Sequence, residues 1–347
     1  MTSSNNRFYF IDNSKVIGIF FVIYAHTQLF HPLQNWIYSF LMPVFFFISG
    51  YLFSFNGKNN IKDFVKRRYR QLLIPYIKIN AVTYIFWFFI LRHVGVSNDE
   101  NIPFWKPLLA TLLGDGENMI HDVPLWFIVC LFIMEITYYA LYKEKKIHSR
   151  ILITAAFMCI GYTSYKTLGN ALPFSLGTMF TGMIFYSLGN ELRRVNFQFK
   201  YIKDNNKLSA AVSTIIFIIL LTATVLMSIE NGRIRMYRNL YGFYPLFLFN
   251  GICGIFMVMT FCKLLETRNR LITYISRNTI WISGYHFLTF ALIKGFLLYI
   301  VGFDITKLDD TVLYNLFFTM ASFIMCIIGI YITDRIHYYI DNRKSNK

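Results

Sequence analysis

Ten long runs of apolar residues restrict the fold of this chain more than any other feature of its sequence. A helix needs about 20 mostly apolar residues to cross a bilayer. These runs are apolar throughout, whereas the strands of a membrane barrel alternate apolar and polar residues. Because lipid offers the backbone no hydrogen-bond partners, helices are the remaining way to cross. We therefore predict an all-α, polytopic transmembrane helical bundle, with spans at 16–31, 36–55, 76–91, 125–142, 151–165, 173–192, 208–228, 243–265, 279–301 and 312–332.

The formal net charge of +16 would favour a nucleic-acid partner, but its distribution argues for a membrane topology instead. Of the 34 Lys and Arg residues, 26 fall in the two terminal segments and in every second connection between the predicted spans. Cytoplasmic loops of membrane proteins carry such an excess. We therefore predict cytoplasmic termini, contact with membrane lipids and no nucleic acid. The opposite side holds only eight basic residues: Arg92, Lys106, Lys166, Arg233, Arg235, Arg238, Lys294 and Lys307.

Cysteines and short motifs give no sign of a metal or cofactor. The five cysteines lie within predicted spans without C-x-x-C spacing, which is typical of small apolar core residues. No phosphate-binding or metal-binding motif is present, so we expect no metal and no permanently bound cofactor. No cleavable signal peptide is visible. We expect residues 1–347 to form a single integral membrane domain, without an appended soluble domain.

The first predicted span carries the strongest candidate site. Lys15 and His26 are separated by 11 residues, which places them about 20° apart around a helix at about 100° per residue. Asp12 falls about 40° from the same stripe by the same arithmetic. His26 would lie about 16 Å deeper than Lys15, at a depth where a neutral imidazole is tolerated and acts as a base. We predict a catalytic site from these three residues; the alternative is a structural histidine hydrogen-bonded between helices.

A basic cluster in the second connection is the next candidate. Arg67 and Arg70 lie three residues apart, which gives them one helix face. Two guanidinium groups on one face suit a phosphate or pyrophosphate. The alternative is a cluster that only contacts anionic lipid. From the spacing alone, both interpretations stay open.

Several other polar residues fall inside or beside predicted spans, where ionisable groups are costly. Glu135 and His286 are candidates for supporting His26 or for structural pairing. The outer arginines Arg233, Arg235 and Arg238 are candidates for binding an anionic acceptor, or for lying at the lipid interface with their charges in water. Ser49 and Gly50 are small residues that permit close helix approach and need no catalytic role.

Five segments of the sequence resemble the acyltransferase-3 family of membrane O-acyltransferases. They lie at residues 10–26, 37–51, 67–76, 124–128 and 283–286, so the resemblance extends over nearly the whole chain. The family's arginine-x10-histidine signature falls on Lys15 and His26, with lysine in place of arginine as in the branch of fucose-type O-acetyltransferases. Its arginine-x-x-arginine motif falls on Arg67 and Arg70.

This resemblance implies transfer of an acetyl group from cytoplasmic acetyl-CoA to a hydroxyl of a surface polysaccharide or lipid-linked sugar, at a bacterial inner membrane. His26 would be the general base or an acyl relay, and Arg67, Arg70 and Lys15 would bind the donor. Trp126 and Phe127 would form a wall of the site or stack on the sugar. The rival interpretations are a polytopic transporter or flippase for a sugar, lipid or organic acid, and a structural scaffold. The sequence leaves the acylated sugar and the oligomeric state open.

Overall fold

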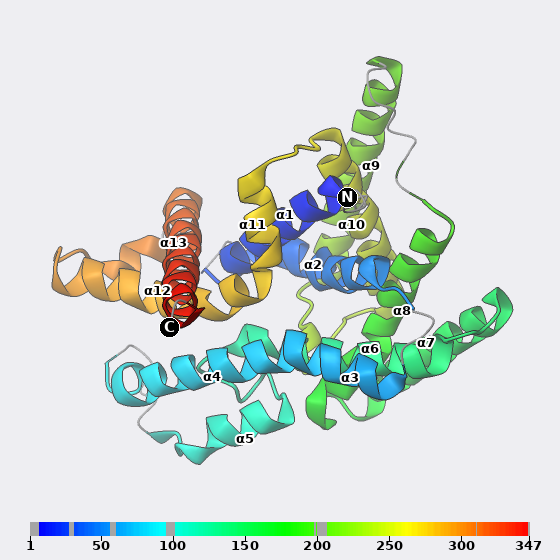
Figure 1. Cartoon of the computed structure of the whole chain (residues 1–347). Coiled ribbons are helices and arrows are strands. Elements are labelled where there is room, and N and C mark those ends of the chain that lie inside the picture. Colours follow the sequence, from blue (N-terminus) through cyan, green and yellow to red (C-terminus); the bar gives the residue numbers. More distant parts are fainter. Residues whose placement is uncertain are drawn as a thin grey trace.

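The computed structural model describes residues 7–27, 31–55, 60–94, 101–197, 199, 207–309 and 311–345. Within these ranges the chain is helical, and its β structure is limited to one bridge between Arg235 and Leu240. The predicted all-α bundle is therefore confirmed (Figure 1). In chain order the helices are α1 (Tyr9–Ala25), α2 (His31–Leu52), α3 (Ile61–Arg68), α4 (Ile74–Phe86), α5 (Trp105–Leu113), α6 (Trp126–Tyr142), α7 (Ile147–Thr167), α8 (Leu176–Arg194), α9 (Lys207–Asn231), α10 (Tyr244–Leu264), α11 (Arg270–Arg277), α12 (Thr279–Tyr299) and α13 (Val312–Ser345).

Seven helices in the described part of the chain are long and apolar enough to cross a membrane. They correspond to seven of the ten predicted spans. The other three predicted spans, at 16–31, 151–165 and 173–192, fall on α1, α7 and α8, which are helical but do not meet the same length and composition. The count of ten spans and the side of the termini stay predictions.

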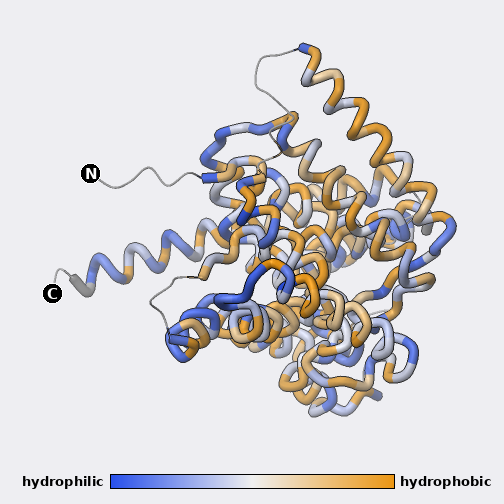
Figure 2. The backbone as a smooth tube through the Cα atoms, turned by 90° about the vertical axis from the view of Figure 1, so that its right-hand side faces the viewer, coloured by the Kyte–Doolittle hydropathy of each residue, from blue (hydrophilic) through white to orange (hydrophobic). Residues whose placement is uncertain are grey.

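Helix α9 has a large apolar surface that is not covered by the rest of the protein. This helix has 25 residues, and only 17% of its most apolar 18-residue stretch is buried inside the protein. Figure 2 shows apolar colouring along this and the other long helices, with hydrophilic colouring gathered in connections and at the end of α13. A soluble protein would bury such a surface, whereas lipid is as apolar as the side chains themselves. The large exposed apolar side chains of α9 include Leu208, Ile215, Ile218, Ile219, Leu226 and Ile229.

Helices α2 and α8 approach each other closely through two glycines. A Cβ atom built on Gly50 would lie 1.9 Å from the carbonyl oxygen of Tyr186. A Cβ on Gly189 would lie 2.1 Å from the carbonyl oxygen of Phe47. Both contacts are with backbone, so no side-chain rotation could make room. The structure therefore confirms that Gly50 allows close helix approach.

Residues 61–91 form one continuous helical segment that includes two π-helical turns, Tyr69–Leu73 and Trp87–Leu91. The first turn ends two residues before Pro75, which lies at the start of α4. Proline has no N–H to donate and its ring crowds the carbonyl four residues earlier, and the wider π turn accommodates both effects. Arg67 belongs to α3 and Arg70 to the π turn, so the simple one-face geometry expected for this pair does not apply.

Candidate active site

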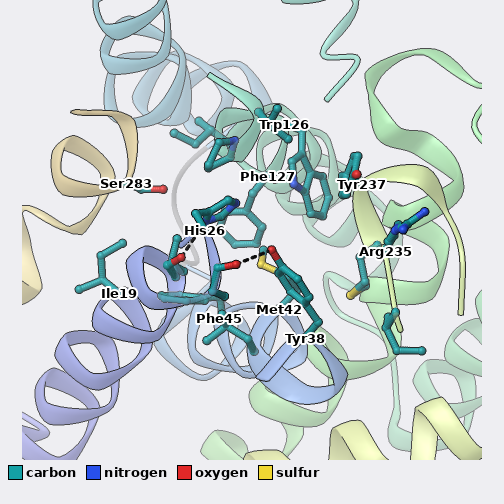
Figure 3. Close-up of a pocket in the computed structure, with 18 of the residues that line it drawn as sticks. Ile19, His26, Tyr38, Met42, Phe45, Trp126, Phe127, Arg235, Tyr237 and Ser283 are labelled. Carbon is teal, nitrogen blue, oxygen red and sulfur yellow. Dashed lines mark hydrogen bonds between the residues drawn. The ribbon is translucent and has the colours of Figure 1, made fainter. Parts of the chain in front are cut away.

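A cavity of about 600 Å³ lies where five segments from distant parts of the sequence meet. Its lining comes from α1 and the residues after it, from α2, from the segment before and at the start of α6, from the loop after α9, and from the first half of α12. Figure 3 shows His26 in the middle of this group, with Tyr38 and Phe127 around it and Ser283 on the α12 side. Of the residues predicted from sequence, the cavity brings together His26, Trp126, Phe127, Arg233 and Arg235.

Side chains satisfy the carbonyl groups at the end of α1. The last four carbonyls of a helix have no partner within it. Here the ring of His26 contacts the Val22 oxygen through Nδ1 at 2.6 Å, and Thr27 donates to Tyr24 at 2.7 Å. This capping ends α1 at Ala25, whereas we predicted a span continuing to residue 31. His26 consequently lies at the C-terminal end of the helix rather than inside it.

The contact with Val22 also determines the tautomer of His26. A carbonyl oxygen only accepts, so Nδ1 must carry the hydrogen and Nε2 keeps its lone pair in the neutral ring. Within the described part of the chain, no hydrogen-bond partner contacts Nε2. The Ala25 oxygen, one residue earlier, accepts from Gln34 at 2.8 Å and from Tyr38 at 3.0 Å. His26 is thus held in one orientation, with an unprotonated nitrogen available at the cavity.

His286 forms a second ring behind His26. The two ring centroids are 5.1 Å apart. Nδ1 of His286 contacts the Ser283 oxygen at 2.6 Å, so this ring has the same tautomer as His26. Its Nε2 is buried and has no hydrogen-bond partner among the described residues. His286 does not line the cavity, and its place against His26 supports a positioning role.

Asp12 and Lys15 lie along α1 away from the cavity lining. The carboxylate of Asp12 accepts from Arg7 at 2.5 Å and from Ser276 at 2.6 Å, which joins α1 to α11. Lys15 is half-buried and forms no ion pair within the described residues. The expected stripe therefore separates into an anchoring carboxylate and an unpaired lysine, both remote from the ring of His26.

The basic cluster forms an ion pair with Glu135 through Arg68, which was not among the residues predicted from the sequence. Arg68, between the two predicted arginines, forms an ion pair with Glu135 at 2.6 Å. Its partner carboxylate is almost completely buried. Arg67 stacks over Phe64 at 5.4 Å, and Arg70 is exposed. Glu135 is thus paired structurally with α3.

The ion pair between Arg68 and the buried Glu135 leads to a testable prediction. We expect Glu135→Gln to destabilise the protein by about 1–3 kcal/mol, because it leaves the half-buried guanidinium of Arg68 without its charged partner. The double variant Arg68→Met/Glu135→Gln is expected to recover a large part of that loss. Thermal unfolding of the purified variants measures both effects. A double variant no more stable than Glu135→Gln alone would contradict this account.

The wall before α6 is held by buried polar groups. His121 donates through Nε2 to the side-chain oxygen of Asn80 at 2.9 Å, which fastens this segment to α4. Burial lowers the pKa of His121 to about 4, so the ring is neutral near pH 7. Burial likewise raises the pKa of the adjacent Asp122 carboxyl. Trp126 and Phe127 follow closely along the chain and line the cavity.

The three outer arginines have different surroundings. Arg238 forms an ion pair with Glu117 at 3.2 Å and does not line the cavity. Arg233 and Arg235 do line it, and Arg233 stacks over Tyr38 at 5.7 Å. Sequence reasoning missed Gln34, Tyr38 and Ser283. The first two are four residues apart and share a helix face, which was an available signal, but their common target on α1 depends on tertiary structure.

A family model described as an acyltransferase domain matches residues 8–334 of the chain. The match therefore includes every helix that lines the cavity. No curated protein and no solved structure gave a significant match.

Proposed function

Because the chain belongs to the acyltransferase-3 family and is a multi-pass membrane protein, we propose that it transfers an acetyl group from cytoplasmic acetyl-CoA to a hydroxyl of a surface polysaccharide or lipid-linked sugar. The observation that carries this proposal is the unprotonated Nε2 of His26 at a cavity of about 600 Å³. A cavity of this size suits a small ligand. The proposed location is a bacterial inner membrane.

In the proposed mechanism, His26 acts as general base. Its Nε2 takes the proton from the acceptor hydroxyl while that oxygen attacks the thioester carbonyl. The carbon–sulfur bond then breaks, and the imidazolium returns the proton to the CoA sulfur. The carbonyl groups at the C-terminal end of α1 favour a positive charge on the ring as it forms. An alternative route carries the acetyl group briefly on His26 before it reaches the sugar.

Lys15, Arg67 and Arg70 are proposed to bind the phosphates of the donor. None of the three lines the cavity, so this assignment requires the pantetheine arm to join a nucleotide site to a thioester near His26. Neither Arg67 nor Arg70 forms an ion pair with a carboxylate within the described residues, which leaves both guanidinium groups available. The proposal is compatible with charge: guanidinium groups bind phosphate in forked geometry and lysine binds it as a point charge.

The donor assignment predicts a selective change in kinetics. We expect Arg67→Met/Arg70→Met to raise KM for acetyl-CoA about tenfold or more, which corresponds to about 1.4 kcal/mol of lost binding. The exposed Arg335→Met on α13 is the control. Steady-state release of CoA at varied acetyl-CoA measures the constant. An unchanged KM in the double variant would remove these arginines from the donor site.

The proposed function itself is tested with purified protein in lipid nanodiscs. Acetyl-CoA is supplied with a saccharide acceptor, and free CoA and acetylated sugar are both measured. Release of CoA together with a mass gain of one acetyl group on the sugar supports the enzyme. Saccharide binding without either product would favour a transporter instead.

A further inference from the structure

The loop between α9 and α10 is a rigid support for its arginines. Arg235 and Leu240 exchange backbone hydrogen bonds of 3.0 and 3.1 Å, which close the loop on itself. The side chain of Asn231, at the end of α9, joins the two ends of the loop. It donates to the backbone oxygen of Tyr241 at 3.0 Å and accepts from the backbone N–H of Phe243 at 2.6 Å.

Two further contacts fix this loop to the helices below it. Thr178 on α8 donates to the carbonyl of Met236 at 2.5 Å. Asn239 donates to the carbonyl of Gly169, after α7, at 2.9 Å. The backbone that carries Arg233 and Arg235 is therefore already ordered, so a ligand that binds them does not have to order the loop, and the entropic cost of binding is lower.

The charge of the cavity is uncompensated. Its lining includes Arg233 and Arg235 and contains neither aspartate nor glutamate. No carboxylate within the described residues forms an ion pair with either arginine, whereas Arg238 on the same loop is paired with Glu117. Arg233 is exposed and Arg235 is half-buried, so both guanidinium groups are available to an oxyanion, which arginine binds in forked geometry.

We propose that Arg233 and Arg235 form an oxyanion subsite, so that the acceptor of this protein is an acidic saccharide whose carboxylate or phosphate ester binds there while its hydroxyl reaches His26. This inference rests on the proposed function and specifies its acceptor. Arg233 stacks over Tyr38, and the ring of Tyr38 lies 6.4 Å from that of His26, so the subsite adjoins the base. The phosphates of CoA are the other source of the same chemistry.

The experiment compares two sugars that differ only at one carbon. Methyl glucuronide carries a carboxylate where methyl glucoside carries a neutral hydroxymethyl group. Binding of each is measured by calorimetry on the intact protein in nanodiscs, without donor. We expect methyl glucuronide to bind about tenfold more tightly or better. Arg233→Met/Arg235→Met should remove this preference, whereas Lys166→Met, which neutralises an exposed charge near the loop, should preserve it.

Acetyl-CoA binding to the same variants separates the two sources of oxyanion. Unchanged affinity for acetyl-CoA in Arg233→Met/Arg235→Met supports an acceptor subsite, and a loss of about tenfold assigns the arginines to the donor and overturns the proposal. Equal binding of both sugars, or binding of neither, also overturns it. Release of CoA is recorded independently, so failure of the acidic preference in an active enzyme leaves the proposed function standing.

Discussion

Replacing His26 with alanine is expected to lower the rate of the proposed acetyl transfer by about 10²–10⁴-fold, the usual contribution of a general base. The reason is geometric: Val22 holds Nδ1 of the ring, so Nε2 is the nitrogen that can take a proton at the cavity. Purified protein assayed for CoA release, and surface glycan examined by NMR for O-acetyl signals, measure the loss.

The control for this prediction is His148→Ala, which removes an exposed histidine near the start of α7. It should retain full activity. Because His26→Ala also leaves the Val22 carbonyl without its partner, His26→Gln is compared in parallel, and both proteins are checked by size-exclusion chromatography. A well-folded variant that transfers acetyl groups at the normal rate would show that His26 is not the base.

Gly50→Ala and Gly189→Ala are expected to destabilise the fold by about 3 kcal/mol or more, at the upper end of overpacking effects. Each new methyl group would meet a backbone oxygen of the opposite helix at about 2 Å. The helices α2 and α8 would have to separate, and α2 carries Gln34 and Tyr38, which hold the end of α1. We therefore expect a lower Tm, less monodisperse protein and weaker activity.

Gly295→Ala and Gly329→Ala are matched controls for the packing prediction. Both glycines lie within helices, and a Cβ at either would meet no atom within 4 Å. Alanine favours a helix over glycine by about 0.5–1 kcal/mol, so these variants should be neutral or slightly more stable. Equal stability of Gly50→Ala and Gly295→Ala would contradict the close approach of α2 and α8.

Helix α1 illustrates where sequence reasoning succeeded and where it failed. Its apolar residues predicted a helix in this region, but the predicted span at 16–31 began seven residues late and ended beyond Ala25. Hydropathy omitted the start because Asp12 is charged, although its partners Arg7 and Ser276 satisfy it. The end was missed because capping of the last carbonyls depends on Gln34 and Tyr38 from α2.

In the basic cluster, too, spacing along the sequence did not predict which residue makes the tertiary contact. Spacing indicated Arg67 and Arg70, yet Arg68 is the arginine that reaches Glu135. A π-helical turn changes the angular position of the residues after Arg68, and helical arithmetic does not include it. Among the outer arginines, spacing could not distinguish the paired Arg238 from the two that line the cavity.

The sequence by itself determined the all-α membrane class and the candidate His26, because long apolar runs and the resemblance to a family are read along the chain. Only the tertiary structure decided which groups share the cavity. That outcome depends on five distant segments meeting, on the glycine contact between α2 and α8, and on the tautomer that Val22 imposes. These are relations between segments, and the free energy that selects them comes from packing and hydrogen bonds that no local pattern contains.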